Sequence, residues 1–114
     1  MASKPRAPGA FWRWVLAAGL CWAGGVGATD PEAGRQRAQL CAACHGPKGL
    51  ARMPMTPNLA GQPEGYIGEQ LKAYRAGRRV HNIMSLIAKP LSDDEIDNLA
   101  AWYASIQVEV VEKP

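Results

Sequence analysis

The stretch Cys41-Ala42-Ala43-Cys44-His45 carries the most specific pattern in this chain, C-x-x-C-H. Its two thiols lie about one helical turn apart, and an imidazole follows directly. This pattern is the attachment signal for covalently bound haem c. Each thiol can add to one vinyl group of the haem, and the imidazole can bind the iron, while the porphyrin supplies four nitrogens. The motif therefore predicts a covalent haem c site with an iron-ligating histidine.

Two other uses of a C-x-x-C pair fit the sequence less well. A structural zinc site needs four ligands. The remaining Cys and His residues are Cys21, in a segment that we expect to be removed, and His81. A thioredoxin-like redox pair belongs in a βαβ setting, and no convincing strand pattern lies nearby. Haem attachment is therefore the preferred interpretation.

Residues 1–28 have the pattern of a secretory signal peptide. Three basic residues precede an apolar run over residues 14–26: Lys4, Arg6 and Arg13. The sequence around Ala28 resembles a signal-peptidase site, so we expect cleavage there and a single haem domain over residues 29–114. No Arg pair precedes the apolar run, which favours a Sec-type route to the periplasm. Because the run is short for a spanning helix, a retained membrane anchor is the less favoured alternative.

The net charge of +3 comes from that first segment, since the chain has 13 Lys plus Arg and 10 Asp plus Glu, and three of the basic residues precede residue 29. A near-neutral domain gives no reason to expect a nucleic-acid partner. Within the domain, residues 35–89 hold nine basic and two acidic side chains, whereas residues 90–114 hold six acidic and one basic. One end of the fold is therefore expected to be positive and to steer an acidic redox partner. An ordinary solvated surface is the alternative.

The apolar spacing predicts an all-α domain. We expect helices over residues 30–41 and 63–76 and a last helix from Ser92 to about residue 107. The region 50–63 is rich in Pro and Gly and is expected to be an ordered loop. A long ordered loop in so small a domain usually has a role, and wrapping a flat cofactor is one such role.

Helix-end signals support these assignments. Asp30 can cap the first helix, Gly77 can stop the second, and Ser92-Asp93-Asp94-Glu95 is a capping box. The last helix is expected to bury a stripe of five residues: Ile96, Leu99, Ala100, Tyr103 and Ile106. In the first helix, a glycine at position 34 would be explained by another helix crossing closely there.

The second axial position of the iron needs a ligand or stays open. Met84 is the preferred candidate, because it lies 39 residues beyond His45 on a non-repetitive segment and can reach the other face of the haem. His81 would give a bis-His site with a lower potential. Met53 and Met55 reach the far face only if the loop doubles back.

The iron-ligating histidine usually donates its other ring N–H to a carbonyl or carboxylate, which orients the ring. The Pro-rich loop that follows the haem motif offers such a carbonyl. Pro54 and Pro57 are both candidates from the sequence, and the spacing does not choose between them.

Together these residues resemble the bacterial class I c-type cytochromes, especially the single-haem cytochrome c553 group and one half of the two-haem cytochrome c4. The similarity covers nearly all of residues 30–107. It rests on segments in this order: Cys41-Ala42-Ala43-Cys44-His45-Gly46-Pro47, Pro57-Asn58-Leu59-Ala60-Gly61-Gln62, Gln70-Leu71-Lys72 with Arg75-Ala76-Gly77, Met84 before Leu91-Ser92-Asp93, and Leu99-Ala100-Ala101-Trp102-Tyr103-Ala104.

The resemblance implies the cytochrome c fold, all-α with three to four helices around one covalent haem c. It implies that the first and last helices cross near Gly34 and Tyr103. It further implies that Met84 is the axial methionine and that the Pro57 carbonyl accepts the hydrogen bond from the ligating histidine.

The chain departs from the family pattern in two respects. It has one C-x-x-C-H, so it is not a complete two-haem cytochrome c4. The family often has a second Met beside the ligand, where this chain has Ile83 and Ser85. With no competing neighbour, the resemblance singles out one methionine.

The expected function is that of a periplasmic single-haem electron carrier rather than an enzyme, with redox proteins as partners. One alternative is a haem subunit held permanently in a periplasmic dehydrogenase or oxidase. Another is a haem sensor or peroxidase in which Met84 leaves the iron. No distal acid–base pair is evident in the sequence, which counts against peroxidase chemistry.

Overall fold

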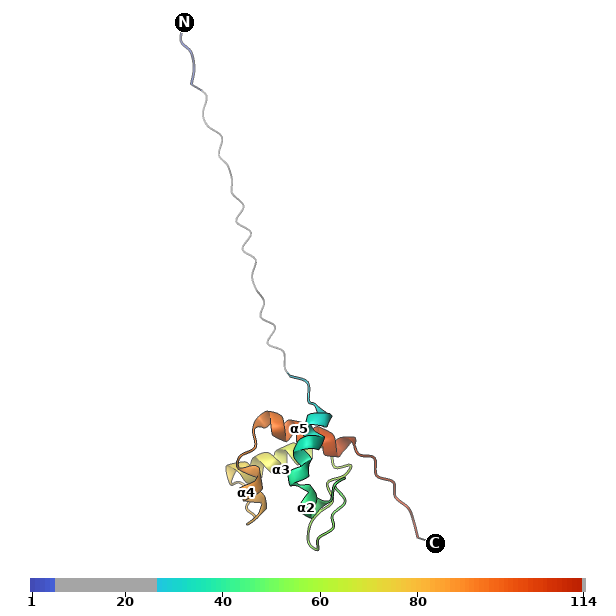
Figure 1. The fold of residues 1–114 in the computed structure, drawn as a ribbon. Helices are drawn as coiled ribbons and strands as arrows, with labels where there is room; N and C mark the ends of the chain where they lie inside the picture. The colour runs from blue at the N-terminus through green and yellow to red at the C-terminus, as the bar shows by residue number, and fades with distance from the viewer. Residues whose placement is uncertain (6–26, 114) are drawn as a thin grey trace.

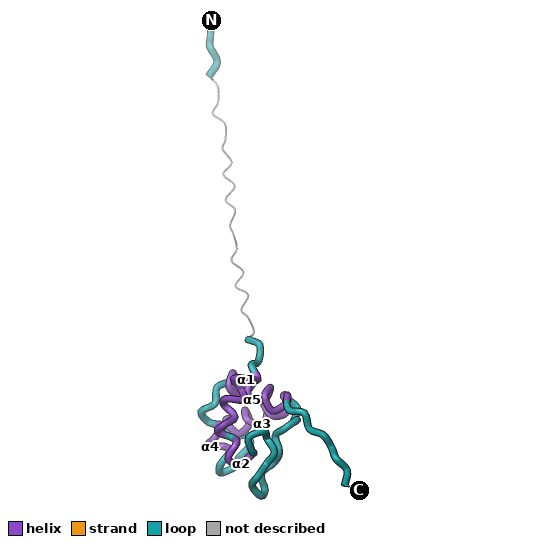
Figure 2. The backbone as a smooth tube through the Cα atoms, turned by 45° about the vertical axis from the view of Figure 1, so that its right-hand side comes forward, coloured by secondary structure: helices purple, strands orange, loops and turns teal. Residues whose placement is uncertain are grey.

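The computed structural model describes residues 1–5 and 27–113. The helices lie within residues 31–105, and no strand occurs among the described residues (Figures 1 and 2). The elements, in chain order, are α1 (Pro31–Arg37), the 3-10 helix η1 (Ala38–Leu40), α2 (Ala42–His45), α3 (Glu64–Ala76), α4 (Met84–Ala88) and α5 (Asp93–Ser105). The all-α prediction is confirmed. The described residues hold more helices than the three to four expected, because two short ones, α2 and α4, lie in segments that were expected to continue a helix or to be irregular.

Helix α1 crosses α5, and the two pack closely (Figure 1). A Cβ atom on Gly34 would lie 1.9 Å from the carbonyl oxygen of Asn98 and 2.9 Å from Cβ of Trp102. The glycine is therefore required because no side chain fits between the two backbones. The expected close crossing near Gly34 and Tyr103 is present, and the residues of α5 that face Gly34 are Asn98 and Trp102.

The predicted helix-end signals are confirmed. The Asp30 side chain accepts hydrogen bonds from the backbone N–H groups of Glu32 and Ala33, at 2.9 and 3.2 Å. Its own N–H donates to Oδ1 of Asn98 at 2.7 Å, which fastens the start of α1 to α5. At the start of α5, Ser92 and Glu95 form the reciprocal capping box, at 3.1 and 3.0 Å. Gly77 ends α3 in the left-handed conformation.

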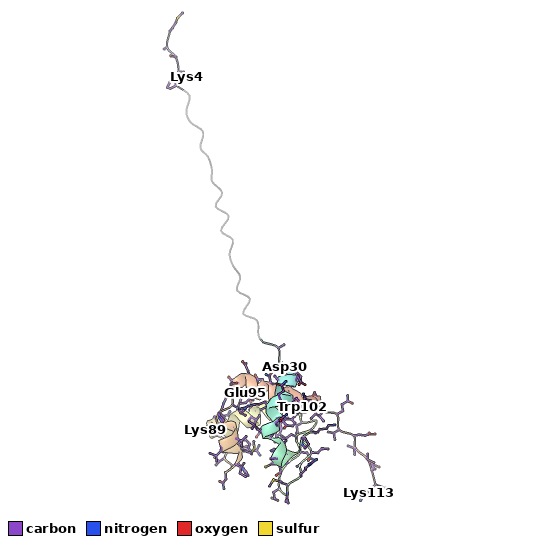
Figure 3. The ribbon with its side chains drawn as sticks, in the orientation of Figure 1. Lys4, Asp30, Lys89, Glu95, Trp102 and Lys113 are labelled. Carbon is purple, nitrogen blue, oxygen red and sulfur yellow. The ribbon has the colours of Figure 1, made fainter. Side chains whose placement is uncertain are left out.

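The core lies between α1, α3 and α5. Its buried cluster consists of Ala38, Ile67, Leu91, Ile96, Leu99, Ala100 and Tyr103. Four of the five residues expected on the buried stripe of α5 are in this cluster, whereas Ile106 ends the helix and is half-buried. Trp102 lies beside the crossing of α1 and α5 and half covers the core, as expected (Figure 3).

Two predicted segments differ from the structure. The first helix was expected to continue through Cys41, but the α-helix ends at Arg37 and tightens into the 3-10 turn η1 before α2 begins. Met84 was expected on a non-repetitive segment, but it begins α4, a helix of five residues. Both differences are local changes of helix type, which apolar spacing does not resolve in segments this short.

The expected signal peptide over residues 1–28 falls mostly on residues 6–26, which lie outside the described residues. Within the part of the chain that the structure describes, no helix is long and apolar enough to cross a membrane.

Candidate haem site

The two cysteines of the motif are presented by α2. Cys41 precedes the helix and Cys44 lies within it, so both thiols project from a single turn. Both are free and half-buried. Among the described helices, α2 and α4 lie at the end of the domain opposite to the start of α1, in both views (Figures 1 and 2). The turn η1 carries the chain from the α1–α5 crossing into this motif.

His45, the last residue of α2, is buried, with 7% of its surface exposed. Its Nδ1 lies 2.8 Å from the carbonyl oxygen of Pro57, which can only accept a hydrogen bond. The imidazole therefore donates from Nδ1, and its Nε2 carries the free lone pair. Of the two carbonyls that the sequence left open, the structure pairs the imidazole with Pro57 and not Pro54.

The loop over residues 46–63 reaches back to the histidine because backbone hydrogen bonds fold it on itself. The N–H groups of Leu59 and Ala60 both donate to the carbonyl oxygen of Gly49, at 2.7 and 3.1 Å. The N–H of Gly61 donates to the carbonyl oxygen of Tyr103 at 2.9 Å, which joins the loop to α5. The loop is thus anchored on the segment after α2 and on α5, and this places the Pro57 carbonyl at the imidazole.

Tyr103, predicted from the sequence only as a core residue, also lies next to Cys41 of the site. Cys41 packs against the buried cluster that contains it. Burial raises the pKa of the Cys41 thiol, and the nearby Tyr103 hydroxyl and Arg37 act in the opposite direction. Burial also raises the pKa of Tyr103, and Cys41 adds to that rise. The Tyr103 hydroxyl is buried without a hydrogen-bond partner among the described residues. A tyrosine hydroxyl on an otherwise apolar stripe was the signal in the sequence, since a buried hydroxyl usually has a polar partner.

Met84, the preferred second ligand of the iron, is less buried than His45. Met84 is half-buried, and Ala88 is the buried residue of its five-residue helix. The other methionine candidates lie on the surface: Met53 is exposed, and Met55 is fully exposed with a left-handed backbone, φ 64°. His81, the remaining candidate, is exposed as well.

The residues present fit a covalently bound haem. Two thiols on one turn, a buried imidazole with its Nε2 free and a half-buried thioether are the donor set that such a group uses. Four apolar side chains of the segment around Met84 are exposed: Val80, Ile83, Leu86 and Ile87.

Fold and site therefore define a small all-helical domain built to hold haem c. Residues 31–107 match the cytochrome c family, and the chain belongs to it. Members of this family bind haem c covalently, and Cys41 and Cys44 fit the motif that does so.

Several named proteins are similar to this chain. Cytochrome c4 of Thiocapsa roseopersicina is 46% identical over 77 residues, which are 67% of this chain and 40% of that protein. Cytochrome c-554(548) of Halomonas halodenitrificans is 41% identical over 81 residues, 68% of this chain and 98% of that protein. A thiosulfate dehydrogenase electron acceptor of Stutzerimonas stutzeri is 42% identical over 69 residues, 58% of this chain and 32% of that protein.

The solved structure of reduced cytochrome c4 from Pseudomonas stutzeri superposes with a TM-score of 0.67 at 36% identity, and the match covers 73% of this chain and 48% of that one. This chain thus spans about half or less of the length of the cytochrome c4 proteins that it matches, and nearly the whole length of the Halomonas cytochrome. The resemblance to one half of cytochrome c4 and to class I c-type cytochromes is confirmed.

Proposed function

We propose that this chain is a periplasmic, single-haem electron carrier whose iron is ligated by His45 and Met84. The observation that carries the proposal is the buried imidazole of His45, oriented by the Pro57 carbonyl so that Nε2 is free beside two thiols on the same turn. Family membership and a relative named as an electron acceptor support electron transfer as the activity.

In this proposal, haem c supplies an iron that alternates between the ferric and ferrous states. Cys41 and Cys44 hold the group covalently, and the Pro57 carbonyl keeps the His45 ring in one orientation and strengthens its nitrogen as a ligand. The Met84 thioether is a soft, neutral ligand, which favours the ferrous state and raises the potential. If His45 and Met84 both bind the iron, no position would remain for a substrate, and the chain would act as a carrier and not as an enzyme.

The positive surface proposed for docking is smaller than the sequence predicted. Seven basic residues of the segment 35–89 are candidates for this surface: Lys48, Arg52, Lys72, Arg75, Arg78, Arg79 and Lys89. Two of them are paired within the domain, since Lys72 Nζ lies 2.9 Å from Asp97 Oδ1 and Arg75 contacts Asp93. Ion pairing cancels much of their attraction at a distance, so the others carry the proposed attraction for an acidic partner.

Arg78 and Arg79 follow α3 and are both exposed. We expect the double variant Arg78→Gln/Arg79→Gln to weaken the salt dependence of electron transfer to an acidic redox protein, because exposed charges act mainly on the association rate. The paired Lys72→Gln variant should change it less. Equal salt dependence in the wild type and the double variant would overturn the docking proposal.

The spectrum of the dithionite-reduced protein, with and without carbon monoxide, tests the ligand assignment. We expect a low-spin c-type spectrum that stoichiometric carbon monoxide does not change. Met84→Ala should open the iron and give a carbon monoxide shift, whereas Met53→Ala and Met55→Ala should not. Insensitivity of Met84→Ala to carbon monoxide would contradict the assignment, and a shift in the unmodified protein would favour the sensor or peroxidase interpretation.

Secretion and a single haem are further parts of the proposal. They are supported by the basic and apolar pattern of residues 1–28 and by the single C-x-x-C-H in the sequence. The mass and N-terminal sequence of the protein after periplasmic maturation test both. We expect an N-terminus at Thr29 and the added mass of one haem.

A permanent place beside a dehydrogenase is the second candidate function. The relative named as a thiosulfate dehydrogenase electron acceptor favours it. Purification of the tagged chain from its host distinguishes the two, because a stable haem subunit brings a stoichiometric large partner with it and a diffusing carrier does not.

A further inference from the structure

His81 is tied to the start of α4 by four hydrogen bonds. Its Nδ1 accepts from the backbone N–H groups of Ile83 and Met84, each at 3.2 Å. Its own N–H donates to the Ser85 hydroxyl at 3.0 Å, and its carbonyl oxygen accepts from the Ser85 N–H at 3.0 Å. The His81 side chain therefore bonds to backbone N–H groups at the start of α4, and the Ser85 side chain bonds to the backbone N–H of His81.

This arrangement of hydrogen bonds resembles a capping box, but it is made by unusual residues. In the ordinary box, a side-chain oxygen accepts from an orphan N–H of the first helical turn, and a second side chain reaches back to the cap backbone. Here an imidazole nitrogen replaces the first group and the Ser85 hydroxyl replaces the second. The orphan N–H that His81 holds is that of Met84 itself, the first residue of α4.

The helix that it holds has little other support. Its five residues are too few for stability on their own, α3 is its main helical neighbour, and Ile83, Leu86 and Ile87 are exposed. The position of the Met84 backbone therefore depends on the bonds at the start of the helix.

We propose that His81 is a positioning residue for Met84: it holds the segment from which the thioether reaches the iron. The inference rests on the proposed His45 and Met84 ligation. It also gives His81 a role other than that of a ligand. When Nδ1 of a neutral imidazole accepts hydrogen bonds, Nε2 carries the proton, so neither nitrogen has a free lone pair for iron.

The test uses the haem-loaded chain and four substitutions in one segment, the fourth being Ser85→Ala. His81→Ala removes the acceptor. His81→Asn keeps a side-chain oxygen that can accept from N–H groups two and three residues further on. Asn82→Ala is the matched control, since Asn82 is exposed and lies between the same residues. The readouts are carbon monoxide affinity of the ferrous protein, the reduction potential and the long-wavelength absorption band of the ferric iron–thioether bond.

We expect His81→Ala to raise the apparent carbon monoxide affinity about fivefold, the factor that corresponds to a lost cap of about 1 kcal/mol. Its potential should fall and its ferric thioether band should weaken. His81→Asn should restore the unmodified values to within about twofold, and Asn82→Ala should not differ from the unmodified protein. Ser85→Ala, which removes the other half of the arrangement, should act in the same direction as His81→Ala.

Two results would overturn the inference and are distinguishable. If Met84→Ala opens the iron but His81→Ala matches the unmodified protein in all three readouts, the positioning role alone is wrong. If Met84→Ala changes nothing and both His81 variants lose the low-spin spectrum, His81 is the ligand and the proposed ligation fails with the inference.

Discussion

The His45 side and the Met84 side of the candidate haem site are built very differently. His45 is buried, its ring is bonded to the Pro57 carbonyl, and the loop that supplies this carbonyl is joined to α5 through the Gly61 N–H. Met84 is half-buried at the start of a five-residue helix whose main helical neighbour is α3. The first ligand is thus placed by the tertiary core, and the second by local hydrogen bonds.

The difference indicates where such a site should open first. Local unfolding free energies are lowest where few apolar contacts are buried and backbone bonds are exposed. The segment around Met84 meets both conditions, whereas the segment around His45 meets neither. The two sides can therefore be separated by experiments that weaken one and leave the other intact.

The largest effect is expected when the covalent attachment is removed. Cys41→Ala/Cys44→Ala should leave a chain without haem and without a cooperative thermal transition, because so small a domain buries little apolar surface of its own. Circular dichroism with thermal melting measures this. A helical apo domain that melts cooperatively would show that the α1–α5 core, and with it the His45 side, is independent of the haem.

The next largest effect is expected on stability, at the crossing of α1 and α5 that supports the His45 side. Gly34→Ala should destabilise the domain by about 3 kcal/mol or more, because the new methyl group meets the Asn98 backbone and cannot be accommodated without moving a helix. Gly65→Ala, on α3 with open space around it, is the matched control and should be neutral or stabilising by up to about 1 kcal/mol. Denaturant unfolding of both variants checks the difference, and equal stabilities would contradict the close crossing.

Hydrogen exchange compares the two sides directly. In the haem-loaded protein, the N–H groups of Leu59 and Gly61 should exchange at least about tenfold more slowly than those of Ser85 and Ile87, since the first pair belongs to the loop anchored on α5. Residue-resolved exchange by nuclear magnetic resonance gives the rates. Similar protection on both sides would show that haem binding makes them equally stable.

The smallest effect lies at the α3–α5 contact next to the Met84 side. Arg75 lowers the pKa of the Asp93 carboxyl. A lowered folded-state pKa stabilises the protein above the ordinary carboxyl pKa, and this contribution is lost as the pH falls through the folded value. Asp93→Asn should therefore lower the melting temperature slightly at neutral pH, and the difference should disappear at acidic pH. The gain is small because the carboxylate is exposed.

Asp94→Asn is the control for this last prediction, because Asp94 lies in the same first turn of α5 but outside the described ion pairs. It changes the charge near the helix N-terminus in the same way. If both variants lower the melting temperature equally, the Arg75 contact contributes nothing and helix electrostatics explains the whole effect.

Local signals predicted the long helices well. Asp30, Gly77 and the Ser92 box mark real helix ends, because each satisfies backbone groups within a few residues of itself. The short helices α2 and α4 were missed as separate elements. Their four and five residues contain too little periodic pattern, and their form depends on the packing of neighbouring segments.

The sequence by itself determined the chemistry of this protein: C-x-x-C-H specifies two thiols and an imidazole on one turn, and that spacing is local. It also determined the all-α class through apolar spacing and end signals. The spacing of residues left Pro54 and Pro57 both open, the family resemblance implied Pro57, and the tertiary structure places the Pro57 carbonyl at His45. Tertiary structure alone decided that Asn98 and Trp102 face Gly34 and that His81 bonds the Met84 backbone. The physical reason is that these contacts depend on how a loop closes and how helices cross, which no short window of sequence contains.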